Sequence, residues 1–396
     1  MNSVSCWLLS GLSENNPWWS ALLRLERSVA AADGESQAAY VNLYRGLLEG
    51  GHDSVAAAMA HELLFGQLPV SHAQLEAGSL RQALELDLQR LNGLAAVDWQ
   101  LVAGKEAGRS LPPLAGLAPA AEGDGTGLAD ALAMGTASAG ELLGIWHRQG
   151  QGRLAKGRAW RWSDGGLQAI PSPAEADFGS LYGLESQLAE LRRATERWLA
   201  GATRLNMLLY GPRGSGKSTA ARALLGSYAR DGLRMIEAAP AELDRLPELL
   251  EQLRDSPLKF ILFVDDLSFG ADPDAWQQLK TLLEGTLQEV PDNLVVLATS
   301  NRRRLVKQQF SDRPDPLDDD ANAWDTQDEK LALADRFGLV INFPSADQRR
   351  YLEIVGRLAG ERGLEPAGLN EAAILFARRG NGMSGRTARQ FVDSLH

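Results

Sequence analysis

The chain has 396 residues, and its composition of 44% hydrophobic and 23% charged residues is typical of globular proteins. The formal net charge of −11 disfavours a protein that holds nucleic acid mainly through phosphate contacts, although a local basic cluster at residues 302–304 leaves that class open. A single cysteine excludes an internal disulfide framework, and because the sequence shows neither an apolar run of membrane-spanning length nor a basic secretory signal, we predict a cytoplasmic location.

Residues 1–177 are predicted to form a mainly helical N-terminal domain. Apolar residues recur at helical spacing in residues 18–23, 55–60 and 80–91. Residues 104–127 are rich in Gly, Ala and Pro, which indicates a flexible segment. Trp146, Trp160 and Trp162 have two interpretations, internal packing or the lining of an interaction groove, and packing is the more common role of tryptophan.

Residues 178–344 are predicted to form an α/β domain. Apolar runs predict strands at residues 205–210, 233–237, 259–264, 294–299 and 339–343. Helical stretches such as residues 217–230 and 274–288 lie between them, so we expect a parallel five-stranded sheet with helices on both faces. Ligands of such sheets bind at the carboxyl ends of the strands.

After Pro344 the pattern becomes helical, and residues 345–396 are assigned to a C-terminal helical domain. Ser345 and Gln348 fit a capping box that opens its first helix, and the last helix is predicted near residues 386–395.

The most informative motif follows the first predicted strand. Residues 211–218 fit the P-loop pattern G-x-x-x-x-G-K-[ST], in which a glycine-rich turn points backbone N–H groups at a phosphate. Lys217 is expected to reach the β- and γ-phosphates of ATP, and Ser218 to bind Mg²⁺. The alternative is a glycine-rich surface turn. The nucleotide-binding residues predicted in this segment are Gly211, Pro212, Arg213, Gly214, Ser215, Gly216, Lys217, Ser218 and Thr219.

Two other predicted strands also end in polar residues. Asp265 and Asp266 end the strand that begins at residue 259; Asp265 is expected to hold Mg²⁺, directly or through water, and Asp266 to orient or deprotonate the attacking water. Asn301 follows the strand at 294–299 and can hydrogen-bond the γ-phosphate or that water. The alternatives are solvated aspartates after a buried strand and a turn-forming asparagine.

In this order, the motifs resemble those of the AAA+ ATPases over about residues 178–396. The resemblance implies that residues 211–218 are Walker A, that residues 261–266 are Walker B, and that Asn301 is the sensor-1 residue. It also implies that Gly183, within residues 181–184, borders the adenine.

The same resemblance implies roles for two arginines. Arg336 corresponds to the arginine finger, which acts on a neighbouring subunit and therefore requires a homo-oligomer, and Arg386 to the sensor-2 residue of a helical lid. The simpler alternatives are a surface ion pair for Arg336 and an exposed lid position for Arg386. More narrowly, the chain resembles an uncharacterised bacterial AAA+ family, known only as a domain of unknown function, from about Trp146 onward.

Asp266 departs from the broad AAA+ pattern, which usually has Glu there. Its shorter side chain places the carboxylate farther from the water, and a misplacement of ~1 Å can cost a hundredfold in rate. We expect a Mg²⁺-dependent ATPase, slow unless a neighbouring subunit tightens the site, that remodels or assembles an unknown macromolecular partner held by the N-terminal domain. The alternatives are a nucleic-acid-associated loader-type ATPase and a nucleotide-gated switch or scaffold with little turnover.

Overall fold

The computed structural model describes residues 16–66, 74–75, 78–114, 127–174, 176–267, 283, 290–301, 336–365, 368–380 and 382–395. Its contacts divide the chain into two compact units, Met1–Gly157 with Asp255–Leu258, and Arg158–Arg254 with Lys259–His396. Apart from residue 283, the predicted helix at 274–288 lies outside the described residues. The basic cluster at 302–304 and the acidic stretch at 312–329, whose acids and prolines favour a mobile insertion, also lie outside them. None of the helices within the described ranges has both the length and the apolar composition to cross a membrane.

The first unit is helical, as predicted. Its helices are α1 (Pro17–Ala31), α2 (Ser36–Gly50), α3 (Val55–Phe65), α5 (Gly78–Ala95), α6 (Trp99–Ala107), α7 (Leu128–Ala133) and α8 (Ala139–Gln149), followed by the 3₁₀ helix η3 (Gly152–Lys156). Side chains cap several of them; the Ser54 Oγ, for example, accepts a hydrogen bond from the Ala57 N–H at the start of α3. Trp146 is fully buried, and its Nε1 donates to the Leu63 carbonyl at 2.9 Å, so this tryptophan packs the core.

The second unit is built on a sheet of seven strands, not the five that the sequence predicts. The strands are β1 (Ala159–Ser163), β2 (Gly166–Ala169), β3 (Met207–Tyr210), β4 (Leu233–Ala238), β5 (Lys259–Val264), β6 (Leu294–Ser300) and β7 (Leu339–Asn342), in the order β2-β1-β4-β5-β6-β3-β7. The two additional strands form a hairpin, and β1 pairs in parallel with β4, with Trp160 opposite Ile236. Residues 158–177, which the sequence assigned to the N-terminal domain, therefore belong to the α/β unit.

The hairpin is stabilised by its turn and by its tryptophans. Asp164 and Gly165 both have positive φ, 52° and 72°, as a two-residue β-hairpin turn of type I′ requires. Trp160 and Trp162 are fully buried and point to the same face of the sheet, because side chains alternate along a strand. Of the two interpretations of these residues, packing is correct.

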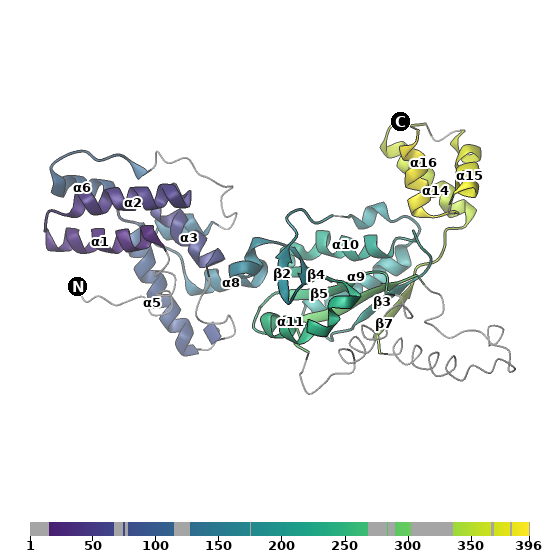
Figure 1. Ribbon diagram of the computed structural model, residues 1–396, viewed down its shortest axis with the longest axis horizontal. Coiled ribbons are helices and arrows are strands. Elements are labelled where there is room, and N and C mark those ends of the chain that lie inside the picture. Colours follow the sequence, from purple (N-terminus) through teal and green to yellow (C-terminus); the bar gives the residue numbers. More distant parts are fainter. Residues whose placement is uncertain are drawn as a thin grey trace. The chain divides into compact units, whose positions relative to one another are not determined.

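Helices cover both faces of the sheet (Figure 1). These helices are α9 (Glu185–Leu199), α10 (Lys217–Tyr228) and α11 (Leu246–Leu253), and short 3₁₀ segments lie at η4 (Phe178–Ser180), η5 (Ala229–Asp231) and η6 (Pro240–Arg245). The apolar side chains of α9 and α10 share a core with Ile261 and Phe263 of β5. Figure 1 shows α11 on the opposite side of the sheet from α10. The main strands of the sheet are thus buried on both faces, as their nearly continuous apolar sequences require.

Three helices form the C-terminal part of this unit, α14 (Gln348–Glu361), α15 (Leu369–Arg379) and α16 (Gly385–Asp393). They pack around a small core that includes Tyr351, Ala373 and Phe391. The predicted capping box is wrong, because the cap of α14 is Asp347, whose carboxylate accepts a hydrogen bond from the Arg350 N–H at 2.8 Å.

Candidate functional site

The P-loop lies at the carboxyl end of β3, which pairs in parallel with β6 on one side and with the edge strand β7 on the other. The chain leaves β3 at Tyr210 and enters α10 at Lys217. Gly211 has a φ of 149°, and a Cβ atom placed there would lie 2.0 Å from the Phe343 carbonyl oxygen. Only glycine fits this position, so the first residue of the motif is fixed by the approach of two backbones.

Lys217 is buried at the base of this loop. Its Nζ donates to the carbonyl oxygens of Gly211 and Pro212 at 2.8 and 2.9 Å, and to Asn301 Oδ1 at 2.9 Å. Burial lowers the pKa of Lys217 to about 8, and the charges of Arg386 and Arg213 act in the same direction, while Asp265 and Asp266 raise it. A bound anion would therefore stabilise the charged form of Lys217.

Asp265 lies directly after β5 and contacts hydroxyl groups from two other elements. Its Oδ1 accepts hydrogen bonds from Ser218 Oγ at 2.7 Å and from Thr299 Oγ1 at 2.6 Å. Adjacent ligands of an octahedral Mg²⁺ at 2.0–2.1 Å lie about 3 Å apart, close to the separation of the Ser218 and Asp265 oxygens. One carboxylate and one hydroxyl are also a donor set that suits Mg²⁺, which keeps several waters. The predicted pair Ser218 and Asp265 thus fits that ion.

Asp266 has a left-handed backbone, with a φ of 54°. Its N–H donates to Thr299 Oγ1 at 2.9 Å, and its carboxylate accepts a hydrogen bond from the Asn301 amide. Left-handed residues other than glycine are uncommon, and they cluster at functional sites where neighbours hold them in place. Asn301 connects Asp266 to Lys217, so residues that follow three neighbouring strands form one hydrogen-bond network.

Thr299 is a site residue that the sequence analysis missed. It is buried at the end of β6 and contacts both predicted acids. The sequence could have indicated this residue, because Thr299 lies two residues before Asn301 at the carboxyl end of the same apolar strand.

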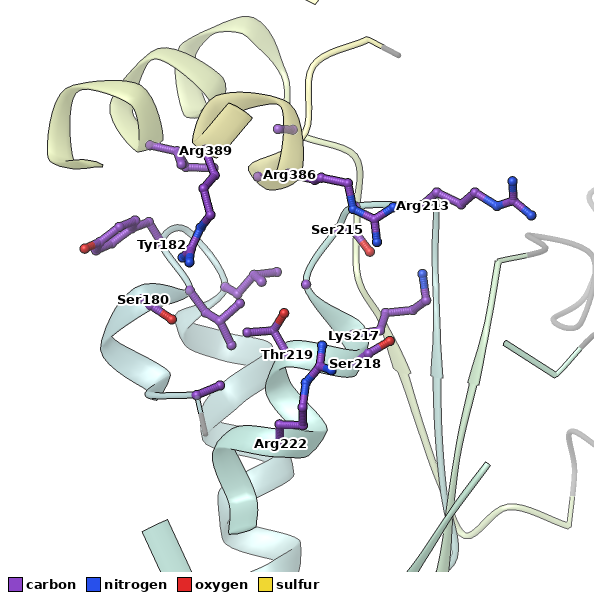
Figure 2. A pocket seen from close by; sticks show the side chains of 18 of the residues that line it. Ser180, Tyr182, Arg213, Ser215, Lys217, Ser218, Thr219, Arg222, Arg386 and Arg389 are labelled. Atoms are coloured by element: carbon purple, nitrogen blue, oxygen red, sulfur yellow. The ribbon is translucent and has the colours of Figure 1, made fainter. Parts of the chain in front are cut away.

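A cavity of about 970 Å³ opens in front of the P-loop (Figure 2). This volume is at the upper end of the range of small-molecule sites. Arg213, Gly214, Ser215, Gly216, Lys217, Ser218, Thr219, Asp265, Asp266, Asn301 and Arg386, all predicted site residues, line it. The other predicted residues, Gly211, Pro212, Gly183 and Arg336, are described but do not line the cavity.

Both charged and apolar residues line the cavity. The apolar ones include Leu181, Leu184, Pro344, Ile354 and Leu358. Its described cations are Arg213, Lys217, Arg222, Arg350, Arg386 and Arg389, against the three acids Asp177, Asp265 and Asp266. An anion with an apolar or aromatic part would match both kinds of lining residue.

The loop that follows η4 contributes Leu181, Tyr182 and Leu184 to the lining of the cavity. The Tyr182 ring lies under the Arg357 guanidinium at 4.7 Å, and its hydroxyl hydrogen-bonds to Glu361, so the loop is attached to α14. Gly183 has a φ of 68°, and a Cβ there would lie 2.7 Å from Arg350 Nε. The glycine allows Arg350 to approach and to donate to the Tyr182 carbonyl at 3.3 Å.

Residues 155–396, more than half of the chain, match the family described as "Protein of unknown function (DUF815)". The chain belongs to this family. The predicted membership of an uncharacterised family, known only as a domain of unknown function, is confirmed. No curated protein matches the sequence.

Solved structures that are similar to part of this chain include the Thermotoga maritima RuvB Holliday junction branch migration motor, at 17% identity and a TM-score of 0.38. The match covers 55% of this chain and 63% of that structure's chain. A point variant of the same protein matches at 18% identity and a TM-score of 0.37, over 53% of this chain and 61% of that one.

Proposed function

We propose that this protein is an ATPase that uses ATP with Mg²⁺. The observation that carries the proposal is the single network of Lys217, Asn301 and Asp266, next to the pair Ser218 and Asp265. These residues follow three neighbouring strands and line one cavity that contains more cations than acids. Phosphates need the cations, and Mg²⁺ needs the carboxylate and the hydroxyl.

The residues have separate roles in the proposed reaction. The loop N–H groups and the N-terminus of α10 bind phosphate oxygens, and Lys217 stabilises charge at the β- and γ-phosphates. Ser218 and Asp265 would hold Mg²⁺, which supplies neutralisation of the phosphate oxygens. Asp266 accepts a proton from the attacking water, which Asn301 orients, and Arg386 stabilises the transferring group from the lid.

Arg336 is proposed to act on a neighbouring subunit of a homo-oligomer. It is half-buried and does not line the cavity of its own chain, as this role requires. If Arg336→Ala and Lys217→Ala chains are each inactive, mixing them should restore part of the activity, because some interfaces then combine an intact loop with an intact arginine. Mixtures that stay inactive, although native electrophoresis shows mixed oligomers, would exclude the role in trans.

The helical first unit is proposed to select a macromolecular partner, which ATP turnover would remodel or assemble. The second unit holds the whole cavity, and the cavity's lining residues all lie between Ala174 and Arg389. The described residues of the first unit contribute nothing to the cavity lining, and this unit is therefore available to bind the partner. The cytoplasmic location remains a prediction.

The direct test is phosphate release and nucleotide binding by the purified protein, with and without Mg²⁺. We expect Mg²⁺-dependent phosphate release and an ATP affinity that Lys217→Ala weakens by tenfold or more, because the variant removes a buried cation. Arg379→Ala, which removes an exposed arginine of α15 outside the cavity, is the matched control. Wild-type ATP affinity in Lys217→Ala would refute this assignment of the site.

A second candidate, a nucleotide-gated switch with little turnover, is favoured by Asp266. Its carboxylate is one methylene shorter than that of glutamate, and it is already hydrogen-bonded to Asn301. Asp266→Glu should raise the turnover rate without a change in ATP affinity if reach is limiting. Tight ATP binding with almost no turnover in both forms would favour the switch over the ATPase.

A further inference from the structure

Two arginines of the lid, not one, face the cavity. Arg386 and Arg389 lie three residues apart on α16, and both are exposed and line the cavity. The opposite face of α16 is buried through Ala388, Phe391 and Val392, and the Ser384 hydroxyl caps its first turn. Because that face is buried, the face of the helix that carries the two arginines is the one exposed to the cavity.

Neither arginine is neutralised within the described part of the chain. No acid there forms an ion pair with Arg386 or Arg389, and no described group accepts a hydrogen bond from either guanidinium. A guanidinium offers five N–H donors in a planar fork that matches phosphate oxygens. Two such groups on one wall of a cavity favour an anionic ligand that extends past both of them.

The two side chains serve different ends of the cavity. In Figure 2, Arg386 extends toward Ser215 of the P-loop, whereas Arg389 extends toward the loop that carries Ser180 and Tyr182. Electrostatic effects agree with this placement: the charge of Arg386 opposes that of Lys217, whereas the charge of Arg389 lowers the pKa of the Tyr182 hydroxyl. Hydrogen bonding to Glu361 is the largest influence on that hydroxyl, and its net pKa is raised.

The order of groups along a nucleotide indicates what Arg389 meets. The γ-phosphate belongs beside Lys217 and the acids, and the loop N–H groups take the α- and β-phosphates. The base suits the apolar lining residues Leu181, Leu184 and Ile354. The α-phosphate is the phosphate nearest the base, separated from it by the ribose, so it lies at the end of the phosphate chain toward which Arg389 extends.

We propose that Arg389 is a second nucleotide-binding arginine of the lid and that it donates to the α-phosphate, while Arg386 serves the other end of the phosphate chain. This inference rests on the proposed nucleotide site. ATP and ADP share the α-phosphate, so Arg389 attaches the lid to both of them. Arg389 is thus a determinant of how tightly the product ADP is retained, whereas Arg386 distinguishes ATP from ADP.

The test compares the dissociation constants of ATP and ADP for wild-type protein, Arg389→Ala, Arg389→Lys and Arg386→Ala, measured by calorimetry. Arg389→Ala should raise both constants by about tenfold and leave their ratio unchanged, because one charge-assisted hydrogen-bonding group is lost in both complexes. Arg389→Lys should recover part of the loss. Arg386→Ala should weaken ATP more than ADP, and Arg379→Ala should bind both like wild type.

Two results would overturn the inference while leaving the nucleotide site intact. One is wild-type affinity for both nucleotides in Arg389→Ala, and the other is a loss confined to ATP. Circular dichroism of each variant, together with the recovery in Arg389→Lys, separates loss of the contact from loss of the fold. A wild-type protein that binds neither nucleotide would instead refute the proposed function itself, and this inference with it.

Discussion

Affinity for ATP should fall as the pH rises from 7 to 9, because the free protein loses the proton of Lys217 over that range. Burial, assisted by Arg386 and Arg213, lowers the pKa of this lysine to about 8. Bound phosphates stabilise the charged form and raise the pKa again. The contribution of the lysine to binding is therefore fully present well below pH 8 and is lost as the pH rises through 8.

The size of the effect follows from that pKa. With a value of about 8 in the free protein, about nine-tenths of Lys217 is charged at pH 7 and about one-tenth at pH 9. If the bound form stays charged, the dissociation constant of ATP rises about tenfold between these pH values, and at pH 9 each binding event takes up about 0.9 proton. Calorimetry at pH 9 in two buffers of different ionisation enthalpy measures this uptake directly.

Lys217→Arg is the informative control, because a guanidinium stays charged throughout this range. Whatever its affinity, this variant should show neither the pH dependence nor the buffer-dependent heat. The reasoning would be refuted by a wild-type dissociation constant that is the same at pH 7 and 9, with no proton uptake at pH 9.

Three more outcomes are expected. Asp265→Asn should abolish the effect of Mg²⁺ on ATP affinity while leaving metal-free binding intact; a Mg²⁺ titration that matches wild type would contradict the assigned metal site. Gly211→Ala should abolish nucleotide binding, because its Cβ would collide with the Phe343 carbonyl, whereas Gly93→Ala, on an exposed and open part of α5, should stabilise the protein by up to about 1 kcal/mol in urea unfolding. Trp160→Ala should destabilise the α/β unit by about 3–5 kcal/mol in the same measurement, and a loss below about 1 kcal/mol would show that the hairpin is dispensable.

The central strands could be predicted from the sequence because they are buried on both faces and their apolar runs are continuous. The predicted strand at 259–264 has the bounds observed for β5. The β1–β2 hairpin was missed although its turn residues, Asp164 and Gly165, are a strong hairpin signal. Its strands are short, and the polar Arg161 between two tryptophans made the segment look like an isolated aromatic patch rather than the edge of a sheet.

The loop and the acids could be predicted because each follows directly from a strand, and parallel strands bring their carboxyl ends to one edge. The contacts of Thr299 and the orientation of Arg389 are not specified by sequence spacing. Thr299 lies on β6 and contacts the two acids that follow the neighbouring strand β5. Arg389 faces the cavity only because the other side of α16 is buried.

The pairing of β1 with β4 has a practical consequence for expressing the α/β unit alone. A fragment that starts at residue 178, where the P-loop domain was predicted to begin, would leave the β4 edge without its partner strand and remove both buried tryptophans of the hairpin. Unpaired edges of this kind template the association of one chain with another. A truncation that starts at residue 158 keeps the edge covered, and comparing the two fragments by light scattering would show whether the hairpin protects the sheet from aggregation.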